Sequence, residues 1–178
     1  TAALSRDHTI HFDASGLMTT TGGKWTTYRN MAEHAVDQAA DFARLDERPC
    51  TTRSLNVHGF HSSADRFGAL AVYGSDALAI QDLMRTTPEW AEPLHPQLPY
   101  VGAEVIWAAR HEMARTVEDV LARRTRALFL NAHAAEAMAP RVASLMAGEL
   151  GWTDARISSE VASFAALAKG YQLATGNR

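Results

Sequence analysis

The strongest candidate for chemistry is a short run around two adjacent glycines, Thr21-Gly22-Gly23-Lys24-Trp25-Thr26. The pattern predicts that a strand ends here and that a helix begins directly after it. The first amides of a helix lack backbone partners and attract negative charge, and glycine lets a ligand approach the backbone closely. A phosphate or a developing anion would fit this helix start, and Lys24 would add a full positive charge. The same residues also fit an ordinary strand-to-helix turn with a threonine cap, and spacing alone does not choose between the two interpretations.

The remaining candidate residues indicate structure rather than chemistry. His58 and His61 are three residues apart, but no Cys, Asp or Glu stands nearby at the spacing of metal ligands, so we expect a solvated pair and no metal site. His111-Glu112 lacks the second histidine of a zinc-protease helix. Cys50 follows a proline in a predicted linker, and no base accompanies it.

An arginine-rich stretch in the second half of the chain could contact acidic lipid or a partner. Its members are Arg110, Arg115, Arg123, Arg124 and Arg126. Acidic residues are interleaved with them, which favours a network of ion pairs within the domain. Trp90 and Trp107 are expected in the core or at an interface.

The glycine run must be positioned by a small unit at the start of the chain. Residues 9–12 alternate polar and apolar, residues 13–16 have turn chemistry and residues 17–21 are rich in threonine, which together predict a β-hairpin. From Thr26 to Leu45 apolar residues recur on one face of a helix. We place a domain boundary near Asp46, because Pro49 ends the helical pattern.

Residues 46–178 are predicted to be mainly helical. Short helices are expected after Ser63 and after Ser75. Four of the six prolines fall between residues 88 and 99, which indicates an extended connector. Longer helices are predicted over residues 101–113, 132–150 and 157–171. A further helix is predicted to begin at the capping box Thr116-Val117-Glu118-Asp119. Pro140 is expected to kink the helix that contains it or to split that helix in two.

Length and composition limit the classes of function. The chain has 178 residues, 47% of them hydrophobic, which suits one domain or one domain with part of another. Seventeen Lys and Arg against twenty Asp and Glu give a net charge of −3, which argues against a nucleic-acid partner. No apolar run reaches the roughly 18 residues of a membrane span, and the single cysteine cannot form an internal disulfide. We expect a cytoplasmic protein and, because Thr1 opens directly into a patterned stretch, a piece cut from a longer chain.

A succession of motifs resembles one enzyme family. The first motifs are Ser5-Arg6-Asp7, Gly16-Leu17 and Gly22-Gly23-Lys24-Trp25-Thr26-Thr27-Tyr28-Arg29. The later ones are Tyr73-Gly74-Ser75-Asp76, Leu94-His95-Pro96, Leu98-Pro99-Tyr100, Ala103-Glu104-Val105, Arg110-His111-Glu112 and the stretch from Thr116 to Arg126. In this order they resemble the FAD-dependent glycerol-3-phosphate dehydrogenases over nearly the whole chain. Residues 1–45 are similar to the end of that family's flavin-binding α/β domain, and residues 46–178 to its helical C-terminal domain.

This resemblance implies an oxidoreductase that uses FAD to oxidise sn-glycerol 3-phosphate to dihydroxyacetone phosphate and passes electrons to quinone or, in the related oxidases, to oxygen. It implies that Arg6 and Lys24 line the substrate site, where Arg grips the phosphate with two hydrogen bonds and Lys acts as a point charge. The residues implied to contact the flavin are Gly22, Gly23, Lys24, Trp25 and Thr26.

Part of the expected machinery is missing from the sequence. No Gly-x-Gly-x-x-Gly follows a strand, so the ADP-binding half of the flavin site is expected upstream of Thr1. We therefore expect that this chain alone neither holds FAD nor is active. No general base is assigned, because no His or carboxylate among the first 45 residues pairs with Lys24 at a defensible spacing.

A second hypothesis makes the helical domain an interaction module. It would mediate homodimer formation or docking on a membrane, which allows a peripheral place on the inner face of the cell membrane. A hairpin and helix detached from their sheet expose an edge and an apolar face, so we expect residues 1–45 to pack on the helical domain or on another copy.

Overall fold

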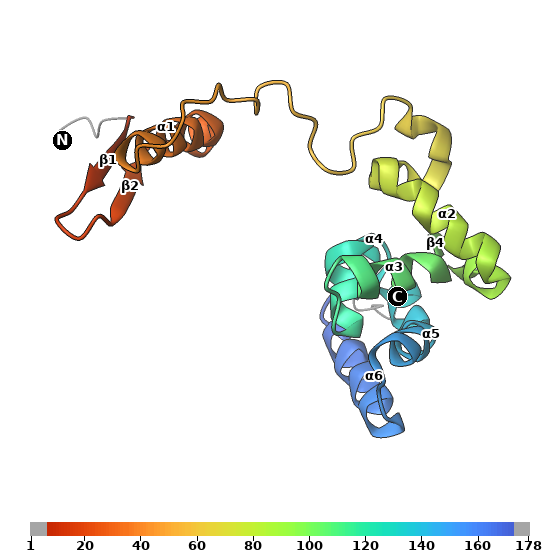
Figure 1. Ribbon diagram of the computed structural model, residues 1–178. Helices are drawn as coiled ribbons and strands as arrows, with labels where there is room; N and C mark the ends of the chain where they lie inside the picture. Colours follow the sequence, from red (N-terminus) through yellow and green to blue (C-terminus); the bar gives the residue numbers. More distant parts are fainter. Residues whose placement is uncertain (1–6, 173–178) are drawn as a thin grey trace, which may run out of the picture. The chain divides into compact units, whose positions relative to one another are not determined.

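The computed structural model describes residues 7–172 and is mainly helical, as predicted, with two small antiparallel hairpins (Figure 1). The chain divides into two compact units, Thr1–Val57 and His58–Arg178. The first unit contains β1 (His8–Phe12), β2 (Met18–Gly22), the 3-10 helix η1 (Trp25–Thr27) and α1 (Tyr28–Phe42). The second contains η2 (Ala64–Asp76), α2 (Ala77–Thr86), η3 (Pro88–Ala91), β3 (Pro93–His95), β4 (Leu98–Val101), α3 (Gly102–His111), the π-helix η4 (Asp119–Arg124), α4 (Ala127–Leu130), α5 (Ala132–Leu150) and α6 (Asp154–Lys169).

The predicted hairpin and helix form the first unit. β1 pairs with β2 so that His8 lies opposite Gly22 and Phe12 lies opposite Met18. Phe12 also stacks on Phe42 of α1, with the ring centroids 4.5 Å apart. This contact attaches the turn end of the hairpin to the last turn of α1.

The first unit has no core of its own. None of its described residues, 7–57, is buried. Its large exposed apolar residues are Leu17, Trp25, Tyr28, Val36, Phe42, Leu45, Leu55 and Val57. A unit of this kind depends on a further surface for most of its hydrophobic stabilisation, which agrees with its expected origin at the end of a larger domain.

The second unit is built around α3 and α5. All residues of α3 from Gly102 to Ala109 are buried, and α5 buries nine of its residues, from Ala132 to Met146. The main core cluster joins these helices to α4, η4 and Phe164 of α6. A smaller cluster lies between α2 and α3 around Ile80 and Trp107, so Trp107 is a core residue, as predicted.

The proline-rich segment differs from the predicted extended connector. It forms η3, with Pro88 in its first turn, and then the hairpin β3–β4, in which Pro93 pairs with Val101. Proline is tolerated at the first position of a helix and of a strand, which is where Pro88 and Pro93 stand. The segment is therefore part of the folded unit, with Leu98 buried in the main core cluster.

Pro140 does not split its helix. α5 runs through Pro140 as one element. The proline is exposed, while Met138, Ala139, Val142 and Ala143 around it are buried. Burial of this apolar face offsets the cost of about 3 kcal/mol that a proline imposes on a helix interior.

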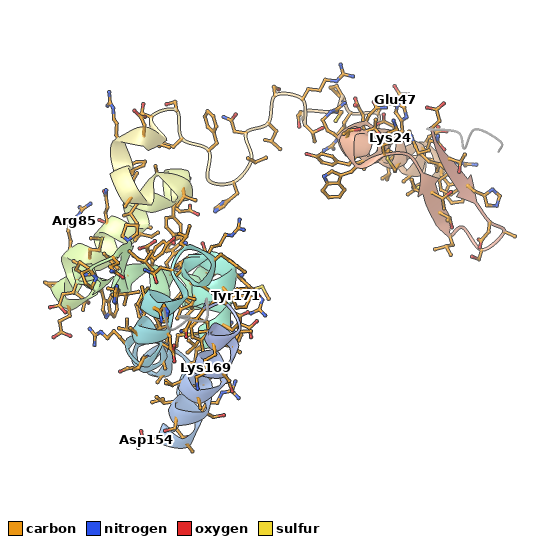
Figure 2. All side chains as sticks on the ribbon, turned by 180° about the vertical axis from the view of Figure 1, so that it is seen from behind. Lys24, Glu47, Arg85, Asp154, Lys169 and Tyr171 are labelled. Carbon is orange, nitrogen blue, oxygen red and sulfur yellow. The ribbon has the colours of Figure 1, made fainter. Side chains whose placement is uncertain are left out.

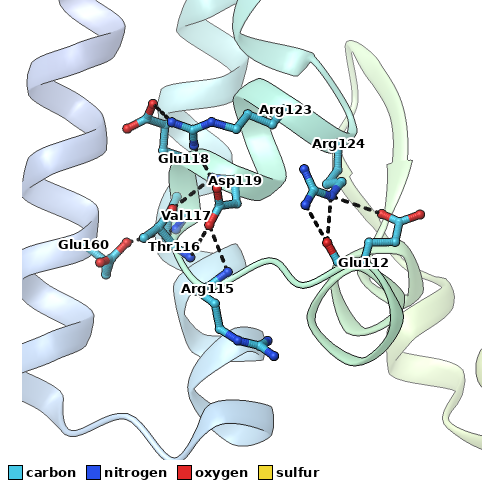
Figure 3. A network of polar contacts seen from close by, with 9 residues as sticks. All are labelled: Glu112, Arg115, Thr116, Val117, Glu118, Asp119, Arg123, Arg124 and Glu160. Atoms are coloured by element: carbon cyan, nitrogen blue, oxygen red, sulfur yellow. Dashed lines mark hydrogen bonds and ion pairs between the residues drawn. The ribbon is translucent and has the colours of Figure 1, made fainter. Parts of the chain in front are cut away.

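The predicted capping box is present between α3 and α5. Thr116 and Asp119 bond each other's backbone N–H groups, and Asp119 also accepts the N–H of Arg115 (Figure 3). Burial alone would raise the pKa of Asp119, but these hydrogen bonds hold it below its usual range. Glu160 of α6 accepts the Val117 N–H at 2.9 Å, which ties α6 to the same turn.

Candidate functional site

Two glycines with positive φ connect β2 to the helix in the first unit. Gly22 has φ 80° and Gly23 has φ 76°, a conformation that other residues adopt only with strain. A Cβ on Gly22 would lie 2.9 Å from the carbonyl oxygen of Asp7, and a Cβ on Gly23 would lie 2.4 Å from the Sδ of Met31. A backbone carbonyl thus excludes a side chain at Gly22, whereas at Gly23 the neighbour is the flexible end of Met31 and the positive φ is the main constraint.

The helix after the glycines begins at Lys24. The Thr27 hydroxyl bonds the backbone of Lys24 at both ends, accepting from its N–H at 3.3 Å and donating to its carbonyl at 2.9 Å. α1 follows η1 directly, but Thr27 between them has non-helical backbone angles (φ −108°, ψ 8°), so Trp25 and Thr26 begin a single 3-10 turn in front of α1. The threonine contacts expected of an ordinary strand-to-helix turn are therefore present.

The side chains at this helix start are open to solvent. Lys24 is exposed (Figure 2), and no ion pair of Lys24 occurs among residues 7–172. Trp25 is 86% exposed and stacks on Tyr28 with ring centroids 5.6 Å apart. The arrangement is a cation and free amides beside an aromatic surface, which suits a planar, anionic ligand.

The structure thus brings five of the six predicted site residues together along one turn. These are Gly22, Gly23, Lys24, Trp25 and Thr26. Arg6, the predicted phosphate ligand, lies outside the described residues.

Sequence reasoning missed a histidine pair beside this turn. His34 Nδ1 of α1 lies 3.2 Å from His8 Nε2 of β1, and the ring centroids are 5.1 Å apart. His8 is the residue opposite Gly22 in the hairpin. The two histidines are 26 positions apart in the sequence, and only the strand register together with the helix phase predicts that they meet.

Comparison with known proteins decides the family. The family model described as the C-terminal domain of alpha-glycerophosphate oxidase matches residues 21–157, a range that includes the glycine turn and most of the helical unit. The chain belongs to this family.

Named relatives of this alpha-glycerophosphate oxidase C-terminal domain are dehydrogenases. This chain is 39% identical to the probable mitochondrial glycerol-3-phosphate dehydrogenase of Caenorhabditis elegans, over 87% of this chain and 24% of the relative. It is 35% identical to the mitochondrial glycerol-3-phosphate dehydrogenase of Mus musculus, over 90% of this chain and 25% of the relative. The chain thus spans about a quarter of the length of these curated relatives.

A solved structure shows the same fold. The Bacillus halodurans glycerol-3-phosphate dehydrogenase, complexed with FAD, superposes with a TM-score of 0.67 at 24% identity. The match covers 96% of this chain and 39% of the bacterial chain. At this identity the likeness supports the fold of the alpha-glycerophosphate oxidase C-terminal domain and no individual contact.

Among its described residues, the helical unit of this family member buries two carboxylates, Glu160 and Glu104. Glu104 is 3% exposed, accepts the Val101 N–H at 2.8 Å and accepts the Tyr73 hydroxyl at 3.0 Å. Burial raises the pKa of Glu104, and its two hydrogen bonds counteract that rise only in part. Burial and the neighbouring Glu104 also raise the pKa of Tyr73. Both carboxylate oxygens have partners, so this group joins β4 and η2 to α3.

The arginine-rich stretch is engaged within the unit, as predicted. Arg123 pairs with Glu118 and Asp119, and Arg124 pairs with Glu112 (Figure 3). The other three arginines also have partners. Arg110 pairs with Glu149, Arg115 donates to the carbonyls of Ala109 and Ala114, and the Arg126 guanidinium lies over the Phe129 ring.

The histidines His58 and His61 make separate contacts. His58 Nε2 lies 2.8 Å from Asp76 Oδ2, and His61 Nδ1 accepts the N–H of Ser63. Among residues 7–172, no three His, Cys, Asp or Glu side chains are grouped closely enough to hold a metal ion. Over the same residues, no helix has the length and apolar character needed to cross a membrane.

Proposed function

We propose that this chain is the C-terminal part of an FAD-dependent glycerol-3-phosphate dehydrogenase, and that the glycine turn with Lys24 forms one wall of its substrate and flavin site. The observation that carries the proposal is Lys24 itself. It is an exposed cation at a helix start, directly after two positive-φ glycines, inside the segment that matches the family model.

The residues of the turn fit one edge of a flavin. The glycines bring the backbone close, and the amides of Trp25 and Thr26 lie at the start of η1, whereas the Lys24 N–H donates to the Thr27 hydroxyl. The sequence carries no Gly-x-Gly-x-x-Gly for the ADP half of the cofactor, so the parent's upstream residues would hold the rest. When bound, FAD supplies the acceptor for the hydride that leaves the secondary carbinol carbon.

The charged residues of this chain would bind and orient the substrate. Lys24 attracts the phosphate as a mobile point charge, and Arg6 grips it with two parallel hydrogen bonds. Helix amides that point at a developing negative charge stabilise that charge most where water is excluded. The turn is open to solvent in this chain, so it would stabilise the charge fully only in the assembled parent enzyme.

Four further features of the parent belong to this proposal: the first rests on the family resemblance, the next two on the interaction hypothesis, and the last on composition. They are a quinone acceptor, a homodimer, peripheral attachment to the inner face of a membrane and an otherwise cytoplasmic location. The domain division proposed with them assigns residues 1–45 to the flavin domain and residues 46–178 to the helical domain. The chain alone is proposed to be inactive.

An interaction role for the helical unit is the second candidate. Phe129 and Tyr171 meet edge to face with ring centroids 5.5 Å apart, and they are 53% and 50% exposed. Leu130 beside them is 66% exposed. An exposed aromatic group of this kind is typical of contact surfaces.

Substitution of Lys24 tests the proposed site. In the FAD-loaded parent enzyme, we expect Lys24→Ala to lower kcat/KM for glycerol 3-phosphate at least tenfold, about 1.4 kcal/mol of transition-state stabilisation. Lys24→Arg keeps the charge and should lose less. Lys169→Ala, at the exposed end of α6, removes the chain's other lysine and serves as the matched control (Figure 2). Equal kcat/KM for Lys24→Ala and Lys169→Ala would remove Lys24 from the site.

Substitution of Arg6 tests the phosphate contact. We expect Arg6→Ala to raise KM for glycerol 3-phosphate more than KM for glycerol, because only the former loses an ionic partner. Steady-state kinetics with both substrates measures the difference. A similar effect on both substrates would contradict the assigned role.

A further inference from the structure

The histidine pair joins the two elements that carry the glycine turn. β1 is attached to α1 at two points, through Phe12 and Phe42 at one end and through His8 and His34 at the other. Four residues of strand span about 13 Å and eight residues of helix span about 12 Å, so the two contacts match in spacing. Phe12 and Phe42 carry no ionisable group, whereas each imidazole of the second contact has two ring nitrogens that can share a hydrogen bond.

The glycine turn lies directly against His8. Gly22 is the strand partner of His8, and the Gly23 N–H donates to the carbonyl of the preceding Asp7 at 3.3 Å. A Cβ on Gly23 would lie 3.4 Å from the Cβ of His8, which shows how closely the turn follows β1. A shift of His8 relative to α1 would therefore move the turn and Lys24 with it.

The contact depends on the number of protons that the pair carries. Two neutral imidazoles share one hydrogen bond, because one nitrogen donates and the other accepts. A singly protonated pair keeps that bond and strengthens it. Two imidazolium rings present N–H groups to each other and repel, so the second proton breaks the contact.

Other charged groups around the pair are few. On α1, Glu33 is bonded to Arg29 at 2.7 Å, and that bond holds the pKa of Glu33 below its usual range. Asp37 lies one turn further along the same helix. Asp7 precedes His8, Lys24 follows the glycines, and β2 carries no titratable side chain. Glu33 is also 3.8 Å from the guanidinium of Arg53, so its carboxylate is held by two arginines.

We propose that the hydrogen bond between His8 and His34 is a positioning contact for the proposed reaction. It fixes β1 on α1 beside the glycine turn, holds Lys24 and the first helix amides in place, and does so only while at least one imidazole is neutral. This inference rests on the proposed function of Lys24.

The test uses pH profiles of the FAD-loaded parent enzyme. We expect His34→Ala to lower kcat/KM for glycerol 3-phosphate about threefold to tenfold at pH 8. His34→Asp offers a carboxylate to a protonated His8, so it should restore activity to within about twofold and move the acid limb of the profile to lower pH. His11→Ala, on the same strand, is the matched control and should leave the profile unchanged.

A second readout does not depend on turnover. Hydrogen exchange of the amides in residues 22–28 is measured in the wild-type enzyme and in His34→Asp, with the intrinsic effect of pH removed. We expect extra exchange in acid for the wild type and little for His34→Asp. Equal protection of these amides in both proteins across the pH range would overturn the inference, even if activity changed.

The outcomes distinguish the positioning role of the histidine pair from the proposed role of Lys24 in the site. If Lys24→Ala loses activity while His34→Ala keeps the wild-type rate and profile, the positioning role alone is refuted. If Lys24→Ala retains full activity, the proposed site is refuted and the positioning role is refuted with it.

Discussion

Glu104 of α3 is the residue that bonds this helix to both η2 and β4. Its carboxylate is buried and bonds the Tyr73 hydroxyl and the Val101 N–H. Removing a buried acceptor leaves its donors without partners, which costs more than the bonds themselves contribute. The exposed ion pairs of the arginines contribute about 1 kcal/mol or less each, so this single buried group outweighs any one of them.

Substitution of Glu104 gives a pH-dependent prediction. Because the pKa of Glu104 is raised in the folded state, the folded protein binds the proton more tightly than the unfolded chain does. Its contribution to stability is therefore present in acid and is lost as pH rises through the interval between the unfolded and the folded pKa. Glu104→Gln, which can accept from Val101 and donate to Tyr73, should abolish this loss, whereas Glu104→Ala should cost about 2–4 kcal/mol at neutral pH. Urea unfolding at several pH values measures both, and a pH-dependent loss retained in Glu104→Gln would contradict the assignment.

At the scale of elements, the pattern of polar and apolar residues predicted the hairpin, α1, α3, α5 and α6. It did not predict the hairpin β3–β4, because its strands are short and Pro93 and Pro99 suggest an extended chain. The histidine pair was also beyond sequence reasoning, since its contact needs the register of β1 and the phase of α1 together. The glycine turn was predicted as a local motif, and its link to a substrate came from family resemblance.

The element η2 contains two glycines that form a natural matched pair. Gly68 has φ 58° and ψ −123°, and Gly74 has φ 54° and ψ −123°. A Cβ on Gly68 would meet nothing within 4 Å, whereas one on Gly74 would lie 1.7 Å from the carbonyl oxygen of Gly59. That carbonyl accepts the Ser75 N–H at 3.0 Å. The absence of a side chain at Gly74 therefore allows Gly59, near the start of the helical unit, to bond to η2.

We therefore expect unequal costs from the same substitution. Gly68→Ala should lower the free energy of unfolding by about 1–3 kcal/mol, because only the backbone is strained. Gly74→Ala should lower it by at least about 1 kcal/mol more, because a backbone carbonyl must also move. Thermal unfolding of the two variants side by side measures the difference, and equal losses would show that the contact with Gly59 does not matter.

At the scale of the whole molecule, the two units differ in what stabilises them. The helical unit has two core clusters, whereas none of the described residues of the first unit is buried. Residues 1–45 are still predicted to pack on the helical domain or on another copy, and in the parent the flavin domain would supply the missing surface. The wall of the proposed site therefore lies on the unit that depends most on its neighbours, which is why the chain alone is proposed to be inactive.

The most direct measurement is an FAD titration of this chain and of the upstream-extended parent, followed by anaerobic addition of glycerol 3-phosphate. Flavin fluorescence reports binding, and loss of the flavin absorbance reports reduction. The account predicts that only the parent binds FAD and is bleached, and that Lys24→Ala slows its bleaching. A parent that binds FAD and is not bleached by glycerol 3-phosphate would contradict it.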